Sequence, residues 1–132
     1  MPYSVTWEAP AGVWLRLYGA VTAAEFVKAV HEVHSHHHYD GLRYVIDDLS
    51  GMEDFEVDMT TVLEVLAASI GAGMVNPNRR IYVVSDHEKI IGYLKMVAEE
   101  YGEALPIARY STLEQARGAI EADASHQRQF KR

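Results

Sequence analysis

The chain of 132 residues contains no cysteine, which excludes disulfide bonds, thiolate metal ligands and cysteine nucleophiles. Basic residues are also few, because twelve lysines and arginines stand against nineteen aspartates and glutamates, a formal net charge of −7. This charge repels phosphate backbones, so nucleic acid is not expected as a partner. No apolar run is long enough to span a bilayer and no signal peptide is recognisable. We therefore expect no integral membrane segment and a cytoplasmic location.

Apolar sequence, in contrast, is plentiful. Hydrophobic residues make up 48% of the chain, which is ample for one packed core at this length. We expect a single domain over residues 1–124. Residues 125–132 show no periodicity and are expected to form a flexible C-terminal tail.

Two segments near the N-terminus, 3–8 and 13–18, alternate apolar and polar residues around a turn that contains proline and glycine. This pattern predicts an antiparallel hairpin. If the leucines of the second strand face the core, Trp14 and Tyr18 face the opposite way. Trp7 also lies in the hairpin. The outward pair of Trp14 and Tyr18 predicts an association surface, and hence a homodimer. The competing interpretation is that helices cover both faces and bury the rings.

Helical and strand patterns alternate after the hairpin. Capping boxes that begin at Thr22, Ser85 and Ser111, and a cap at Asp58, predict four helices. Continuous apolar runs at 42–47, 81–84 and 107–110 predict buried strands between them. The order predicts an α/β fold: a single-domain, mixed, mostly parallel five-stranded sheet with an N-terminal antiparallel hairpin and four helices.

Polar residues follow directly on two central strands, in the segments 43–51 and 80–86. Ligands of covered parallel sheets bind beyond the carboxyl ends of the strands, so we predict a ligand rim there. Its candidate residues are Asp48, Ser50, Asp58, Ser85 and Asp86.

Four segments of the chain, 17–22, 45–51, 81–84 and 110–120, resemble the STAS domain, the fold of bacterial anti-sigma-factor antagonists, and more narrowly its SpoIIAA-like branch. The resemblance implies a regulatory module. In antagonists of that family, a serine in an Asp-Ser-Ser-Gly motif is phosphorylated to switch partner binding. The matching segment reads Asp58-Met59-Thr60-Thr61 here, so the resemblance places Thr60 at the phosphoacceptor position.

Two other clusters suggest metal chemistry. His31, His34 and His38 share one side of the first helix if it extends that far, and imidazoles on adjacent turns bind transition metals. The competing interpretation is that they are solvated at the negative end of the helix dipole. Asp47 or Asp48 with Asp86 would suit Mg²⁺ in a small metal-dependent enzyme. The competing interpretation is that these aspartates only end strands and cap helices. Alternation along the strand also lets only one of Asp47 and Asp48 face a given side of the sheet.

No catalytic constellation accompanies these residues, so we expect a non-enzymatic binding module without a cofactor. Its partner would be a protein or a small apolar ligand. The helices expected over 59–74 and 90–101 are rich in Met, Val, Ile and Leu, and a cleft between them would admit a lipid-like ligand. The alternative is that these residues only form part of the hydrophobic core. The alternative functions are the metal-dependent enzyme and a phosphoregulated antagonist that uses Thr60.

Overall fold

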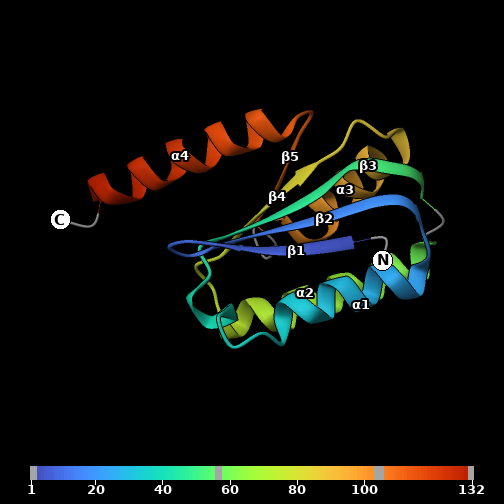
Figure 1. Cartoon of the computed structure of the whole chain (residues 1–132), viewed down its shortest axis with the longest axis horizontal. Coiled ribbons are helices and arrows are strands. Elements are labelled where there is room, and N and C mark those ends of the chain that lie inside the picture. The colour runs from blue at the N-terminus through green and yellow to red at the C-terminus, as the bar shows by residue number, and fades with distance from the viewer. Residues whose placement is uncertain (1–2, 56–57, 103–105, 131–132) are drawn as a thin grey trace.

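A five-stranded sheet lies at the centre of the protein, with helices on both faces (Figure 1). The computed structural model describes residues 3–55, 58–102 and 106–130. The elements are β1 (Tyr3–Glu8), β2 (Gly12–Val21), α1 (Ala23–His34), a 3₁₀ turn (Tyr39–Gly41), β3 (Tyr44–Phe55), α2 (Met59–Val75), β4 (Arg80–Val84), α3 (Glu88–Tyr101), β5 (Ile107–Tyr110) and α4 (Leu113–Phe130). The α/β fold predicted from the sequence is confirmed.

The strands follow one another across the sheet in the order β1-β2-β3-β4-β5. β1 and β2 pair antiparallel, whereas β2, β3, β4 and β5 are parallel neighbours. Each crossover between parallel strands advances in the same direction, so right-handed connections place α1, α2 and α3 on the same face. Helix α4 follows the edge strand β5 and covers the opposite face (Figure 1).

The hairpin has the predicted alternation. Val5 lies opposite Leu15 across the β1–β2 pair. Val13, Leu15 and Leu17 are fully buried on the face of the three helices, whereas Trp14 is half-buried and Tyr18 exposed on the other. The period of two therefore assigned the two faces of β2 correctly.

Strand β3 extends well beyond its predicted end near residue 47. It continues to Phe55 because β2 is also long, and the two strands remain paired as far as Val21 opposite Phe55. Register shifts near Tyr18 and Gly19 accommodate the extra length, and Gly19 has a φ of 69°, which glycine adopts without strain. Ser50 and Gly51 therefore lie within a strand and not in a loop.

Two of the four predicted helix caps are formed at the expected residues, and two are displaced. The Thr22–Glu25 capping box is formed, and Asp58 caps α2 by accepting from the backbone N–H of Thr61. The other two boxes are displaced. His87, not Ser85, caps α3 through its imidazole, which accepts from the backbone N–H of Lys89. At α4 the backbone N–H of Gln115 donates to Thr112 and not to Ser111.

Helix α1 ends at His34 and does not extend as far as His38. The hydroxyl of Ser35 donates to the carbonyl of His31 at 2.7 Å, and Ser35 caps the helix. A serine hydroxyl offers the last carbonyls an alternative to further helical hydrogen bonds. Consequently His38 is not on the helix that carries His31 and His34.

The largest core lies between the sheet and helices α1, α2 and α3, around Leu15, Val45, Leu49 and Val83. On the other face Ile46, Tyr82, Val84 and Ala116 form a smaller core beneath α4. Burial of these side chains from water is the main source of stability for both layers.

Two polar contacts join α4 to the sheet. Arg117 donates to both carboxylate oxygens of Glu8, at 3.1 and 2.8 Å, and the hydroxyl of Tyr82 donates to Asp123 at 2.6 Å. The helix continues to Phe130, so residues 125–130, expected to belong to a frayed tail, are helical.

Candidate functional site

An apolar cavity lies between the sheet and helices α2 and α3, at the position of the cleft predicted from the sequence. Its volume is about 100 Å³. Each of the two helices contributes four side chains to its wall, and strands β3, β4 and β5 form the floor. The helix residues are Val62, Val65, Leu66 and Ser69 from α2, and Ile90, Tyr93, Leu94 and Val97 from α3.

Among the described residues, Asp47 contributes the one carboxyl group in this wall. It lies between Val45 and Leu49 on β3, and the alternation that buries those two side chains turns Asp47 to the same face. Among the described residues, no hydrogen bond or ion pair reaches its carboxylate. Asp47 is half-buried, and its side chain lines the cavity.

This environment changes the acidity of Asp47. Desolvation raises the pKa of its carboxyl from 3.8 to about 6, and the positive charge of Arg79 opposes that rise only in part. A carboxyl group with a raised pKa, facing a cavity, is typical of functional sites. At neutral pH the apolar wall therefore carries a predominantly ionised carboxylate.

Arg79 is the second charged group of the interior, with an exposed fraction of 2%. Its Nε donates to the hydroxyl of Tyr39 and its Nη2 to the carbonyl of Ser69. Among the described residues, its Nη1 has no hydrogen-bond partner. Buried donors are nearly always paired, so this guanidinium nitrogen is an exception within the core.

A second chamber of about 50 Å³ connects these two groups. Asp47 and Arg79 both line it, together with His34 and several side chains that also line the larger cavity, including Phe26, Val65 and Ser69. Burial, and next the neighbouring guanidinium of Arg79, lower the pKa of His34 to about 4, so its imidazole is neutral at physiological pH. The chamber thus holds one carboxylate and one guanidinium that do not touch.

The next residue on β3, Asp48, points to the opposite face, as alternation predicted. It is buried and accepts from the indole N–H of Trp14 at 3.0 Å and from the hydroxyl of Ser50 at 2.6 Å. The guanidinium of Arg117 lies over the Trp14 ring, 5.6 Å from its centre. These contacts join β2, β3 and α4, so they give Asp48 and Ser50 a structural role.

The remaining candidates for the ligand rim lie at the ends of strands and helices. Asp86 is exposed and forms an ion pair with Arg109 at 3.5 Å. Ser85 is buried, and its hydroxyl accepts from the backbone N–H of His87 at 3.1 Å. The carboxylate of Asp58 is occupied as the cap of α2.

Thr60 lies in the first turn of α2 and is exposed, whereas Thr61 is buried. Its hydroxyl is therefore accessible from solvent, as a phosphoacceptor requires. The hydrogen bond from Thr61 to Asp58 lowers the pKa of that carboxyl, which keeps a negative charge beside Thr60.

The histidines divide into two groups. His31 and His34 border a shallow hollow between α1 and α2, and His34 packs edge-on against Tyr39. The 36–38 segment instead stacks on the hairpin, where the rings of Trp7 and His36 are 3.9 Å apart. In the part of the chain that the structure describes, no group of three or more His, Asp or Glu side chains is placed to hold a metal ion.

The three aromatic residues of the hairpin differ in their surroundings. Trp7 lies on the helix side of the sheet, against His36, and Trp14 is held against Asp48 and Arg117. Only Tyr18 is largely exposed, at 39%. Self-association through this face stays a prediction.

Sequence reasoning missed Arg79 and the orientation of Asp47 toward the cavity. A signal for Asp47 was present, because a carboxylate occupies one inward position of an otherwise apolar strand. No sequence signal distinguished Arg79 from its exposed neighbour Arg80.

Comparison with protein-family models and with curated proteins finds no match to this chain. Within the residues that the structure describes, none of the helices has the length and hydrophobicity needed to cross a membrane.

Proposed function

We propose that this chain is a non-enzymatic binding module of STAS-like, SpoIIAA-like fold that takes up a small apolar ligand between α2 and α3. The observation that carries the proposal is the apolar cavity of about 100 Å³ with the Asp47 carboxyl in its wall. Ligand pockets are typically apolar with a few polar groups that orient the guest. The order of strands and helices supports the family resemblance.

The position of Asp47 supports binding more than it supports plain core. A core without a ligand gains nothing from a carboxylate whose desolvation raises its pKa to about 6. Residues that weaken a fold are typically retained where function needs them. Asp48, one residue later, accepts hydrogen bonds at both of its carboxylate oxygens.

The proposal is tested by titrating the protein with 1-hexanol while the methyl resonances of Val62, Leu66 and Val97 are followed by NMR. We expect saturable shifts confined to these cavity methyls. Val65 lines both chambers, so Val65→Phe should fill the space and abolish the shifts. Leu63 is 45% exposed on the same helix, and Leu63→Phe is the matched control that should bind as the parent does.

Two results would count against a ligand cavity. One is the absence of any saturable shift in the parent protein. The other is a Val65→Phe variant that keeps a well-dispersed spectrum and binds 1-hexanol with unchanged affinity.

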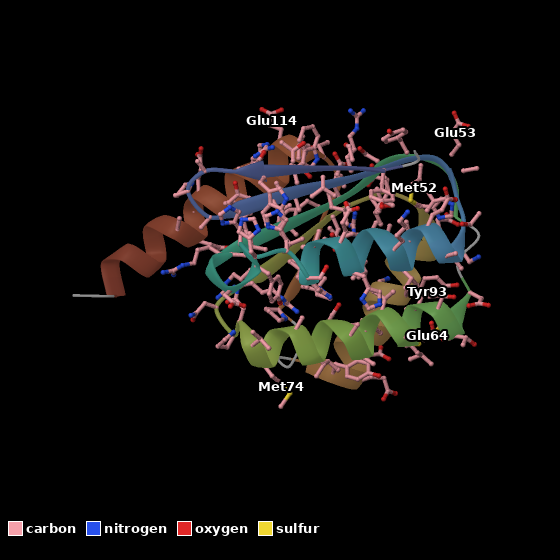
Figure 2. The ribbon with its side chains drawn as sticks, turned by 60° about the horizontal axis from the view of Figure 1, so that its bottom comes forward. Met52, Glu53, Glu64, Met74, Tyr93 and Glu114 are labelled. Atoms are coloured by element: carbon pink, nitrogen blue, oxygen red, sulfur yellow. The ribbon has the colours of Figure 1, made fainter. Side chains whose placement is uncertain are left out.

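A protein partner is a second candidate function, favoured by the outer surface of α2. Met59, Leu63, Met74 and Val75 are exposed there, at 37%, 45%, 83% and 66%, and Met74 projects away from the body of the molecule (Figure 2). Exposed apolar side chains on one helix are typical of an interaction surface. Thr60 lies at the start of this surface, where a phosphate would meet the unpaired N–H groups of the helix.

Phosphoregulation at Thr60 predicts that Thr60→Asp and Thr60→Ala capture different sets of proteins in a quantitative pull-down. Identical sets from the two variants would exclude this switch. No arrangement of the described residues favours the metal-dependent enzyme.

A further inference from the structure

The chamber beside the apolar cavity contains two opposite charges that do not pair with each other. Asp47 and Arg79 both line it, yet neither an ion pair nor a hydrogen bond joins them. Arg79 is held in place by hydrogen bonds to Tyr39 and Ser69. The protein thus fixes a guanidinium and a carboxylate in the wall of one space of about 50 Å³.

The charges decide which polar group this space accepts. A carboxylate would pair with Arg79 but would be repelled by Asp47. An ammonium group would pair with Asp47 but would be repelled by Arg79. A neutral group is repelled by neither charge, and a hydroxyl is a small neutral group that can donate a hydrogen bond to the carboxylate.

We propose that the ligand of the α2–α3 cavity is a neutral amphiphile whose hydroxyl head group donates to the Asp47 carboxylate and lies beside the guanidinium of Arg79. This inference rests on the proposed function and specifies its ligand class. The apolar tail extends from the smaller chamber into the larger cavity, since Phe26, Val65 and Ser69 line both spaces.

The two volumes set the size of the enclosed part of the ligand. The larger cavity has about 100 Å³ and the chamber about 50 Å³. An apolar protein cavity of about 150 Å³ accommodates benzene, a molecule of about six heavy atoms. 1-Hexanol is close to this size and carries the hydroxyl at one end.

Four probes of similar length separate the head groups in NMR titrations at pH 7.5: 1-hexanol, 1-methoxypentane, hexanoate and hexylammonium. 1-Methoxypentane has as many non-hydrogen atoms as 1-hexanol, but its ether oxygen accepts without donating. Because hydrogen bonds to charged groups are the stronger kind, we expect 1-hexanol to bind roughly tenfold more tightly than each of the other three.

Asp47→Asn tests the role of the carboxylate directly. The variant leaves Arg79 as the one charge of the chamber, so hexanoate should gain affinity while 1-hexanol loses it, each by roughly tenfold. Glu53→Gln removes the same charge from an exposed position on the same strand, where Glu53 points outward (Figure 2), and should leave the order of the four probes unchanged.

The outcomes separate the two proposals. If all four probes bind with similar affinity, or if Asp47→Asn does not alter their order, the hydroxyl inference is wrong while the ligand cavity stands. The same holds if Glu53→Gln alters the order as much as Asp47→Asn does. If none of the probes binds, the cavity is not a ligand site and both proposals fail.

Discussion

Replacing Asp47 with asparagine should stabilise the folded protein at neutral pH. Asparagine has nearly the shape of aspartate but cannot ionise, so the variant keeps the packing of the cavity wall and removes the charge. The free energy of unfolding should increase by about 3 kcal/mol. Such a gain is unusual, because most substitutions in a protein interior destabilise the fold.

The magnitude follows from the pKa of Asp47. The folded protein raises this pKa from 3.8 to about 6, and each pKa unit corresponds to about 1.4 kcal/mol. Between these two values the folded state binds more protons than the unfolded state, so the stability of the parent falls as the pH rises. Well below pH 3.8 both states are protonated and the penalty vanishes, whereas well above pH 6 both are ionised and it is complete.

Urea unfolding of the parent and of Asp47→Asn at pH 4.5, 5.5, 6.5 and 7.5 measures this difference. The stability advantage of the variant should be about 1 kcal/mol at pH 4.5, increase with pH and level off above about pH 6.5. Glu53→Gln, which removes an exposed carboxylate from the same strand, should show no such increase. An Asp47→Asn variant that is less stable than the parent at pH 7.5 would refute the reasoning, as would an advantage that does not depend on pH.

Three further substitutions test the framework around the site by urea unfolding. Trp14→Phe removes the indole N–H that donates to buried Asp48 and should cost about 1–3 kcal/mol, so a loss below about 0.5 kcal/mol would contradict that role. Thr22→Ala breaks the capping box of α1 and should cost about 1 kcal/mol, whereas Thr22→Ser should be nearly neutral. Arg117→Met removes a half-exposed ion pair with Glu8 and should lower the free energy of unfolding by less than about 1 kcal/mol. Amide hydrogen exchange in α4 should become faster, and unchanged exchange would argue that the pair does not hold α4 on the sheet.

The sequence was a good guide wherever one periodicity dominated. The alternation of β2 placed Val13, Leu15 and Leu17 in the core and turned Trp14 the other way. The same period separated Asp47 from Asp48, which is why the two carboxylates could not share a metal. Helical spacing also located the two helices that border the cavity.

Tertiary contacts decided what the sequence could not. Strand β3 passes through Ser50 and Gly51 because a long β2 offers it a partner, a non-local interaction that local composition does not reveal. Arg79 is buried because Tyr39 and the carbonyl of Ser69 are positioned to accept from it. Such partners come together only in the folded chain.

These features explain how one strand serves two layers. On the side of α4, Asp48 is satisfied by Trp14 and Ser50 and holds the sheet together. On the side of α2 and α3, Asp47 is left without a protein partner in the described structure and faces the apolar cavity. We therefore interpret the first carboxylate as structural and the second as the polar contact for a ligand.

The most direct test is a filtered NMR experiment that detects nuclear Overhauser effects between ¹³C-labelled protein and unlabelled 1-hexanol. The binding account predicts contacts from the alkyl protons of the probe to the methyl groups of Val65, Leu66 and Val97, with the CH₂ next to the oxygen closest to Val65. Contacts confined to exposed Leu63 and Met74, or no contacts at saturating probe, would contradict a ligand site between α2 and α3.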